Sequence, residues 1–369
     1  MKEFVPRLIA WELTGSCNMK CVHCRASAVE DRDPNELTTQ EIKDTIDNIA
    51  TFAKPILILT GGEPLVREDV FEIARYGTEK GLRVVVGTNA TLITPEAAGK
   101  LLDSGVKRIS VSIDGSTPET HDKFRGLPGA FEGTIKGAKA AQKAGLDFQV
   151  NTTVTKRNVD DLQAMHDLAV KLGAVAHHIF LLVPTGRGED LKDEEISPEE
   201  YENVLNWMYD TQKKMGAKVQ AAGHPHGQEG MFMKATCAPH YFRVMHQRSK
   251  EEGQDITPER AGLNAMTGGC LGGTGFCFIS RTGDVYPCGY LPAKAGNIKE
   301  KSFKEIWEES NLFKDLRDPK KLKGKCGKCQ YKVTCGGCRA RAFAKYGDYL
   351  EAEPYCVYVP PAWKKEQAI

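Results

Sequence analysis

The sequence predicts an α/β fold, a partial (β/α)6 barrel in which six parallel strands alternate with helices. Short apolar runs alternate with longer amphipathic stretches from residue 7 to about residue 185, which is typical of a parallel sheet covered by helices. Several helical stretches, such as 38–53, have Thr or Ser near their start or Gly near their end, the usual signals for helix ends. The six expected strands lie at 7–14, 55–61, 82–89, 107–114, 147–155 and 178–185.

The expected functional face lies at the carboxyl ends of these strands, where parallel barrels place their sites. Three cysteines directly follow the first expected strand, and a Gly-Gly-Glu-Pro motif directly follows the second. Both motifs therefore fall on the same face of the predicted barrel.

Length and charge limit the class of protein. A chain of 369 residues has room for one barrel-sized domain and a smaller one. Its 50 basic and 49 acidic residues give a net charge of +1 without a basic block, so no nucleic-acid partner is expected. The first residues lack a secretory signal and the longest apolar runs fall far short of a membrane span. We therefore expect a soluble, cytoplasmic protein.

The composition divides the chain into three expected segments. The barrel occupies residues 1–190, a charge-rich linker or lid occupies 191–262, and a smaller domain rich in Gly, Cys and Lys occupies 263–369. In the middle segment a helix is expected over about 197–215. The loop that follows it contains His224-Pro-His226 and could cover the mouth of the barrel.

The C-terminal segment is expected to contain short strands and one helix. Apolar runs predict strands at 276–280 and 284–290, and an amphipathic pattern predicts a single helix at 302–317. The 12 cysteines are concentrated at the two ends of the chain, and so many in a reducing compartment indicate metal or redox chemistry instead of disulfides.

The first cysteine group, Cys17, Cys21 and Cys24, forms a CxxxCxxC motif in one short loop. Thiolates are soft ligands that favour iron–sulfur clusters or zinc. Three ligands to a four-iron cluster leave one iron open for a substrate or cofactor, whereas a structural zinc site normally has a fourth protein ligand. His23 could supply that ligand, although its position between the cysteines makes the geometry awkward. The spacing favours iron–sulfur, with zinc as the alternative.

The second motif comprises Gly61, Gly62, Glu63 and Pro64. Glycines allow close backbone approach, and a carboxylate can pair with an ammonium group. Alone, the motif could be any tight turn. Coupled to the three cysteines and the strand order, it resembles the radical S-adenosylmethionine superfamily.

That resemblance implies how the cofactor binds. The amine and carboxylate of S-adenosylmethionine would chelate the open iron, and reduction of the cluster would release a 5′-deoxyadenosyl radical. The Gly-Gly-Glu-Pro loop would receive the methionyl amine. Ser112, Arg125 and Asn151 match positions where relatives contact the cofactor, with Arg125 holding its carboxylate and Asn151 its ribose or carboxylate. Each could instead only cap or fix a loop.

Eight cysteines crowd the C-terminal segment, enough to ligate two four-iron clusters completely. Two zinc ribbons are the alternative, because CxxC pairs also suit zinc. The eight are Cys270, Cys277, Cys288, Cys326, Cys329, Cys335, Cys338 and Cys356.

This segment resembles the SPASM extension of radical enzymes, which carries two auxiliary clusters with interleaved ligands. Two residues instead of the usual three separate Cys335 from Cys338, which leaves the assignment of that pair open. Fully ligated clusters cannot bind S-adenosylmethionine, so we expect them to transfer electrons. The resemblance assigns one cluster to Cys270, Cys277, Cys288 and Cys338, and the other to Cys326, Cys329, Cys335 and Cys356.

Two further residues are candidate catalytic groups. Cys237 is left over from the three sets; it could be an axial iron ligand or a proton donor to a substrate radical, or simply a small buried side chain. Arg187 follows the last expected barrel strand, where its guanidinium could pair with a substrate carboxylate. Anchoring a loop is its alternative role.

Longer stretches, among them ATCAPHYFR and GDVYPCGYLP, resemble the haem-biosynthesis branch of the superfamily. That resemblance implies oxidative decarboxylation of two propionates of iron-coproporphyrin III to vinyl groups, forming haem. A reducing partner such as ferredoxin or flavodoxin is expected. The alternatives are a didecarboxysirohaem deacetylase, an enzyme of dioxo-haem biosynthesis, a peptide-modifying SPASM enzyme, and a non-catalytic iron–sulfur or haem carrier. The cysteine triad and Gly-Gly-Glu-Pro count against a carrier.

Overall fold

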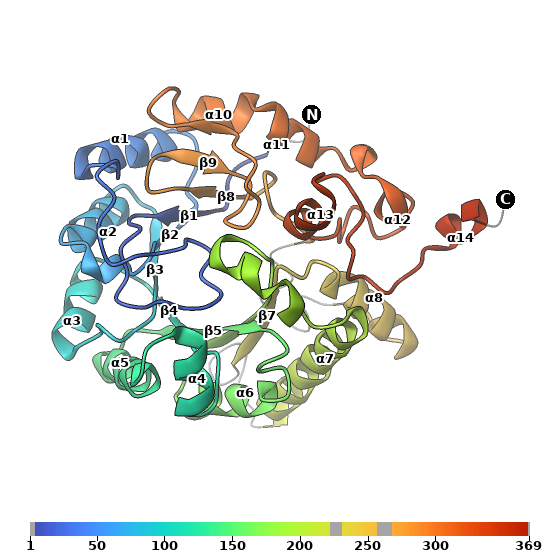
Figure 1. Ribbon diagram of the computed structural model, residues 1–369, viewed down its shortest axis with the longest axis horizontal. Helices are drawn as coiled ribbons and strands as arrows, with labels where there is room; N and C mark the ends of the chain where they lie inside the picture. The colour runs from blue at the N-terminus through green and yellow to red at the C-terminus, as the bar shows by residue number, and fades with distance from the viewer. Residues whose placement is uncertain (1–3, 222–230, 257–267, 368–369) are drawn as a thin grey trace.

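One curved sheet organises the whole fold. The computed structural model describes residues 4–221, 231–256 and 268–367, and ten strands form the sheet in the order β10-β9-β8-β1-β2-β3-β4-β5-β6-β7. Strands β1 to β7 pair in parallel in chain order, and helices lie outside them (Figure 1). The strands are β1 (Leu8–Glu12), β2 (Ile56–Thr60), β3 (Arg83–Thr88), β4 (Ile109–Ser112), β5 (Phe148–Val154), β6 (Ala176–Leu181), β7 (Phe232–Thr236), β8 (Phe276–Ile279), β9 (Asp284–Tyr286) and β10 (Gly296–Asn297).

Several helices begin where the sequence provides a cap. Thr38 and Glu41 form a reciprocal capping box at the start of α1, and Ser302 and Glu305 form another at the start of α10. None of the helices in the described ranges has the length and apolar character needed to cross a membrane. The α-helices are α1 (Thr39–Ala50), α2 (Val70–Glu79), α3 (Pro95–Asp103), α4 (Pro118–Arg125), α5 (Ala130–Ala144), α6 (Leu162–Lys171), α7 (Pro198–Ala221), α8 (Tyr241–Glu251), α10 (Phe303–Glu309), α11 (Asn311–Arg317), α12 (Gly324–Gly327), α13 (Arg339–Tyr346) and α14 (Pro361–Gln367), with short 3-10 turns at η1 (Pro64–Val66), η2 (Gly186–Glu194) and η4 (Pro319–Lys321).

The predicted α/β barrel is confirmed, and its first five strands lie within the expected ranges. The sixth begins and ends earlier than the expected 178–185, before Pro184, which has no N–H for a strand ladder. The helix expected over 197–215 is α7. The His224-Pro-His226 loop lies outside the described residues.

The sheet is wider than the six predicted strands. β7 comes from the segment expected to be a linker or lid, and it pairs in parallel with β6. β8 comes from the expected C-terminal domain, and it pairs in parallel with β1. A strand at a sheet edge has unpaired backbone groups, which these additions satisfy. The boundaries 1–190, 191–262 and 263–369 remain predictions, since the sheet draws strands from all three segments.

The helix expected over 302–317 is wrong as a single element. It is divided into α10 and α11 at Ser310, whose ψ of 125° is not helical. The bend brings the Phe313 ring edge-on to Trp307 at a centroid distance of 5.2 Å. Arg317 then covers the Trp307 ring and donates to the Trp307 carbonyl. Packing of these aromatic rings outweighs the helical continuity that the sequence pattern suggested.

The main hydrophobic core joins the barrel to the C-terminal segment. It includes Ile9 and Leu57 of the barrel strands together with Phe303, Trp307 and Phe313 of α10 and α11. The indole of Trp307 is 1% exposed, and its N–H donates to the Phe4 carbonyl at 2.7 Å. The barrel and the C-terminal segment are therefore stabilised by one continuous core.

We predict that Trp307→Ala lowers the free energy of unfolding by about 3–5 kcal/mol, because it removes a large buried ring and one buried hydrogen bond. Denaturant titration of the anaerobic protein measures this loss. Val333 is 74% exposed, and Val333→Ala should change the same quantity by no more than about 0.5 kcal/mol. Similar values for the two variants would contradict a core shared by α10 and the barrel.

Candidate active site

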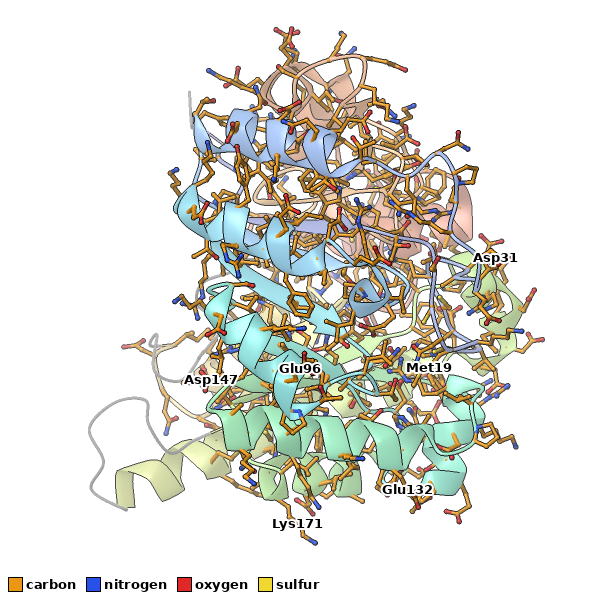
Figure 2. The ribbon with its side chains drawn as sticks, turned by 90° about the vertical axis from the view of Figure 1, so that its left-hand side faces the viewer. Met19, Asp31, Glu96, Glu132, Asp147 and Lys171 are labelled. Atoms are coloured by element: carbon orange, nitrogen blue, oxygen red, sulfur yellow. The ribbon has the colours of Figure 1, made fainter. Side chains whose placement is uncertain are left out.

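The loop that carries the first three cysteines lies at the carboxyl ends of the barrel strands. Figure 2 shows Met19 of this loop on the side of the barrel opposite to Asp147, which immediately precedes β5. The Gly62 N–H donates to the Thr14 carbonyl at 2.7 Å, and the Glu63 N–H donates to the Ser16 carbonyl at 2.8 Å. The Gly-Gly-Glu-Pro loop therefore pairs with the start of the cysteine loop.

Gly62 is required by this close approach. A Cβ atom at position 62 would lie 2.1 Å from the Ser16 carbonyl oxygen and 3.0 Å from the Cys17 Cβ. Neither the rigid backbone nor Cys17 can move away without displacing the cysteine loop. The glycine thus has a structural role beside the cofactor-binding role that the motif implied.

Arg187 binds the other side of the first cysteine loop. Its Nε donates to the Cys21 carbonyl at 3.0 Å, and its Nη1 donates to the Ala28 carbonyl at 2.6 Å. Its backbone N–H donates to the Cys24 carbonyl at 3.1 Å. The structure therefore gives Arg187 the loop-anchoring role that was the alternative, and substrate binding by its buried Nη2 stays a prediction.

The three thiols gather in one small apolar cluster with Met19 and Leu127. Backbone N–H groups point at two of the sulfurs, from Met19 to Cys17 Sγ and from Ala28 to Cys24 Sγ, each at 3.4 Å. Such N–H···S contacts stabilise bound thiolates. Burial raises the pKa of Cys17 to about 12, so deprotonation of this thiol requires a bound metal.

Arg125 lies directly beside Cys21. One nitrogen of its guanidinium approaches Cys21 Sγ at 3.7 Å, and another pairs with the fully buried Asp114 carboxylate. The His23 ring packs on Phe124 at 4.4 Å and faces Asp114 at 3.8 Å, and burial lowers the pKa of His23 well below its usual value. His23 is thus a neutral packing residue of the loop, and its pairing with Asp114 gives no support to a zinc ligand.

Glu63 is a fully buried carboxylate that no cation of the described residues neutralises. It accepts hydrogen bonds from the Leu65 and Asn89 backbone N–H groups and from the Thr88 hydroxyl. Burial raises the pKa of Glu63 to about 7. A carboxylate in this setting suits an ammonium ligand, which fits the methionyl amine that the motif implied.

Ser112 and Asn151 belong to a polar row across the inner face of the barrel. In the strand register Ser112 lies beside Asn151, Asn151 beside His178, and His178 beside Lys234. Register neighbours in parallel strands point to the same face of the sheet. Val111, the residue before Ser112, points to the opposite face and belongs to the helix-covered core. The four polar side chains therefore lie on the inner face, where they are only partly buried. Burial lowers the pKa of Lys234 to about 8 and keeps His178 neutral. His178 lies in an expected strand, and no sequence signal distinguished it.

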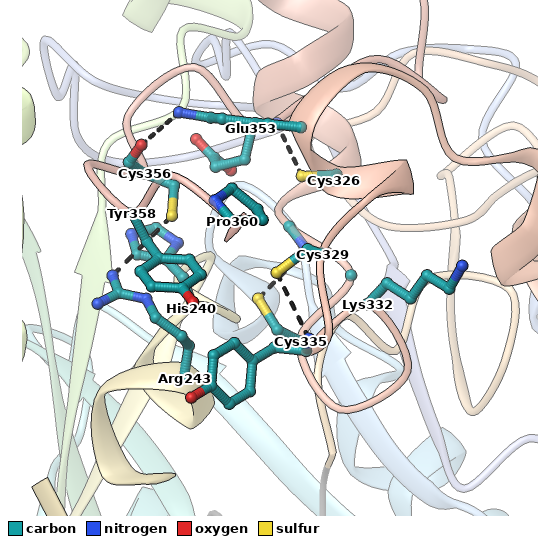
Figure 3. Close-up of a pocket in the computed structure, with 14 residues that line it drawn as sticks. His240, Arg243, Cys326, Cys329, Lys332, Cys335, Glu353, Cys356, Tyr358 and Pro360 are labelled. Carbon is teal, nitrogen blue, oxygen red and sulfur yellow. Dashed lines mark hydrogen bonds between the residues drawn. The ribbon is translucent and has the colours of Figure 1, made fainter. Parts of the chain in front are cut away.

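A second group of thiols surrounds a hollow between α8 and the C-terminal loops (Figure 3). Backbone N–H groups of Glu353, Tyr331 and Gly337 donate to three of these sulfurs at 3.3–3.4 Å. The cysteines that line the hollow are Cys326, Cys329, Cys335 and Cys356, the set that the SPASM resemblance assigned to one cluster.

His240 lines this hollow and has unsatisfied polar atoms. Its ring is fully buried and stacks on Tyr201 at 4.5 Å, and neither ring nitrogen has a hydrogen-bond partner within the described residues. A buried nitrogen without a partner is costly unless a bound group satisfies it. A sulfide-rich cluster would do so, so the residues around the hollow fit an iron–sulfur cluster.

The remaining thiols form a third group, and its members in the structure differ from the expected set by one cysteine. Cys338 packs with Cys237 and Cys288, and the charges acting on Cys288 include that of Cys270. Cys277 is instead fully buried in the main core, where it lies beside Ile9 in the strand register. Cys277, the expected fourth member, therefore lies apart from Cys288 and Cys338 in the structure, whereas Cys237 packs with them, and the ligand set of this group stays a prediction.

The short Cys335–Cys338 spacing is explained by two glycines. Gly336 and Gly337 have φ values of 70° and 66°, a left-handed conformation that favours glycine. The turn directs Cys335 to the hollow of Figure 3 and Cys338 to the third group.

Zinc ribbons and iron–sulfur clusters differ in how closely their thiolate ligands converge. Within the described ranges, no three His, Cys, Asp or Glu side chains converge as a single metal ion would require. A zinc ribbon draws its four thiolates around one ion, whereas a cluster is several atoms wide and its ligands stand further apart.

Comparison with known proteins agrees with this geometry. Residues 11–169 match the radical SAM superfamily, and residues 270–330 match SPASM, an iron–sulfur cluster-binding domain. The chain is 58% identical over 355 residues to the AdoMet-dependent heme synthase of Methanosarcina barkeri, covering 96% of this chain and 97% of that one. It is 34% identical over 358 residues to the Fe-coproporphyrin III synthase of the same organism, covering 95% and 87%. Streptococcus suis SuiB bound to S-adenosylmethionine shares the fold, with a TM-score of 0.72 at 17% identity, over 96% of this chain and 78% of that one.

We predict that Gly62→Ala removes the N-terminal cluster and leaves the thiol groups of the C-terminal segment intact. Because the added Cβ would collide with Ser16, iron per chain should fall by about four after anaerobic reconstitution. Gly99, inside α3, has open space around it, so Gly99→Ala should keep the full iron content. A Gly62→Ala protein with undiminished iron would show that the close contact can relax.

Proposed function

The chain belongs to the radical SAM superfamily, and from that premise we propose that it forms haem by oxidative decarboxylation of two propionates of iron-coproporphyrin III. Membership means that the chain is an enzyme that binds a four-iron cluster and S-adenosylmethionine. The single observation that carries the choice of reaction is the 58% identity to an AdoMet-dependent heme synthase along nearly the whole of both chains. Identity to the Fe-coproporphyrin III synthase is much lower, at 34%.

The chain's part in the chemistry is to position and shield the reacting groups. When bound, the cluster and S-adenosylmethionine supply a 5′-deoxyadenosyl radical, which would remove a hydrogen atom from the propionate carbon next to the macrocycle. Cys17, Cys21 and Cys24 would hold the cluster, and the loop contacts made by Gly62 and Arg187 keep their backbone in place.

The polar row on the inner face of the barrel supports the placement of the ligands. Ser112 and Asn151 would face S-adenosylmethionine, as the family resemblance implies. His178 and Lys234 continue the row, and Lys234 supplies a positive charge below pH 8. An ammonium group inside the barrel favours a substrate with carboxylate arms over a neutral one.

The reaction also releases an electron. After the hydrogen atom leaves, the bond to the carboxylate carbon breaks, carbon dioxide departs, and one electron must leave for a vinyl group to form. We propose that the thiols around the hollow of Figure 3 and those of the third group each hold an auxiliary cluster for this purpose, which brings the total to three. Their burial and N–H···S contacts suit electron transfer, because a rigid site reorganises little.

The first cluster must receive electrons from another protein. A small reducing protein such as ferredoxin or flavodoxin would reduce the first cluster, and such carriers work in the cytoplasm, where we place this enzyme. Buried thiols free to bind iron also require a reducing compartment.

We predict that the anaerobic, reconstituted protein converts iron-coproporphyrin III to haem when given dithionite and S-adenosylmethionine. Each decarboxylated propionate should yield one 5′-deoxyadenosine, and chromatography with mass spectrometry measures both products. Cys17→Ala should abolish both, because it removes one ligand of the radical-generating cluster. Turnover of didecarboxysirohaem in place of iron-coproporphyrin III would contradict the proposed substrate and leave the enzyme class unchanged.

A further inference from the structure

Cys277 does not lie in a position to bind a cluster. It is the second residue of β8, and its side chain enters the main core beside Ile9. It is fully buried among apolar side chains. Burial raises the pKa of its thiol, and the neighbouring charge that acts on it comes from Arg317, with no contribution from another cysteine. Its surroundings are those of a small core residue.

Cys237 lies where a fourth ligand is needed. It directly follows β7, at the same carboxyl-end face of the barrel as the first cluster loop. Its side chain packs in one small cluster with those of Cys288 and Cys338. Cys270 lies close to the same cluster, because a Cβ atom on Gly272 would lie 3.7 Å from Cys270 Sγ and 3.4 Å from the carbonyl oxygen of Pro287, the residue before Cys288.

The backbone of Cys237 is held in an unusual conformation. Its φ of 58° is left-handed, which is rare for a residue other than glycine. The carbonyl of Cys237 accepts hydrogen bonds from the Tyr201 hydroxyl and the Arg341 guanidinium, each at 3.0 Å. Tyr201 and Arg341 are themselves almost fully buried. These two contacts fix the direction in which the thiol leaves the backbone and offset the cost of the strained conformation.

We propose that Cys237 is the fourth thiolate of the auxiliary cluster held by Cys270, Cys288 and Cys338, and that Cys277 is a core residue. The inference rests on the proposed binding of auxiliary clusters, and it does not depend on which substrate is used. Cys237 is then committed to that cluster, so it is neither an axial ligand of the substrate iron nor a proton donor. The ligand set also joins the last barrel strand to the C-terminal segment through iron.

The test compares two matched cysteine variants of the full-length chain, Cys237→Ala and Cys277→Ala. Each is reconstituted anaerobically and assayed for iron and sulfide per chain, and the dithionite-reduced protein is examined by EPR spectroscopy. Cys277→Ala should retain the iron and the EPR signals of the unaltered protein. Cys237→Ala should lose about four irons, or keep them with one EPR signal altered and newly sensitive to added thiolate, as expected of an iron with an open position.

Loss of iron from Cys277→Ala, with Cys237→Ala unchanged in both measurements, would overturn the proposal. Far-UV circular dichroism of each variant identifies any loss of iron that follows unfolding, and Cys277→Val then replaces Cys277→Ala as the space-filling control. No porphyrin or S-adenosylmethionine is present, so an incorrect substrate assignment cannot affect the result. Failure of the unaltered protein to bind about twelve irons would contradict the three-cluster proposal itself.

Discussion

The candidate active site depends on hydrogen bonds that neighbouring segments make with the backbone of the first cysteine loop. The Gly-Gly-Glu-Pro loop pairs with it on one side, and Arg187 binds its carbonyls on the other. Three thiols in a short loop would otherwise be held only by the metal. Here the protein backbone determines their positions, so the cluster enters a loop that is already organised.

Buried arginines perform the same task in the C-terminal segment. Arg341 is 1% exposed and donates to the carbonyls of Leu181 and Leu182 at the end of β6, as well as to that of Cys237 after β7. Glu353 is fully buried, pairs with Arg341 and accepts from the Cys338 N–H. The carboxyl ends of the barrel strands and the loops bearing the last cysteines are thereby tied together. Guanidinium groups suit this role because one planar group can satisfy several carbonyls at once.

This arrangement places redox groups around one end of a single barrel. The first cysteine loop follows β1, Cys237 follows β7, and the hollow of Figure 3 is lined by Arg243 of α8 together with the C-terminal loops. Tyr201 contacts both the carbonyl of Cys237 and the ring of His240, so it packs between the third thiol group and the hollow. In the proposed function, clusters bound by these thiols would accept the electron released at the barrel mouth. The proposed reaction requires such acceptors, because decarboxylation to a vinyl group is an oxidation.

The sequence by itself determined the barrel, the face that carries the site, and the CxxxCxxC and Gly-Gly-Glu-Pro motifs, because these depend on local periodicity and on residues close together in the chain. The interleaved SPASM pattern also predicts that Cys335 and Cys338 belong to different clusters, and in the structure the two thiols lie in different groups. Only the three-dimensional arrangement shows that Arg187 anchors a loop, that His178 and Lys234 extend the row begun by Ser112, and that Cys237 packs with Cys288 and Cys338 while Cys277 does not. A cysteine on a strand can point to either face of a sheet, and its spacing from other cysteines does not reveal which one. The pairing of β8 with β1 directs the Cys277 side chain into the core. The pairing of β7 with β6 places Cys237, at the end of β7, beside the remaining thiols.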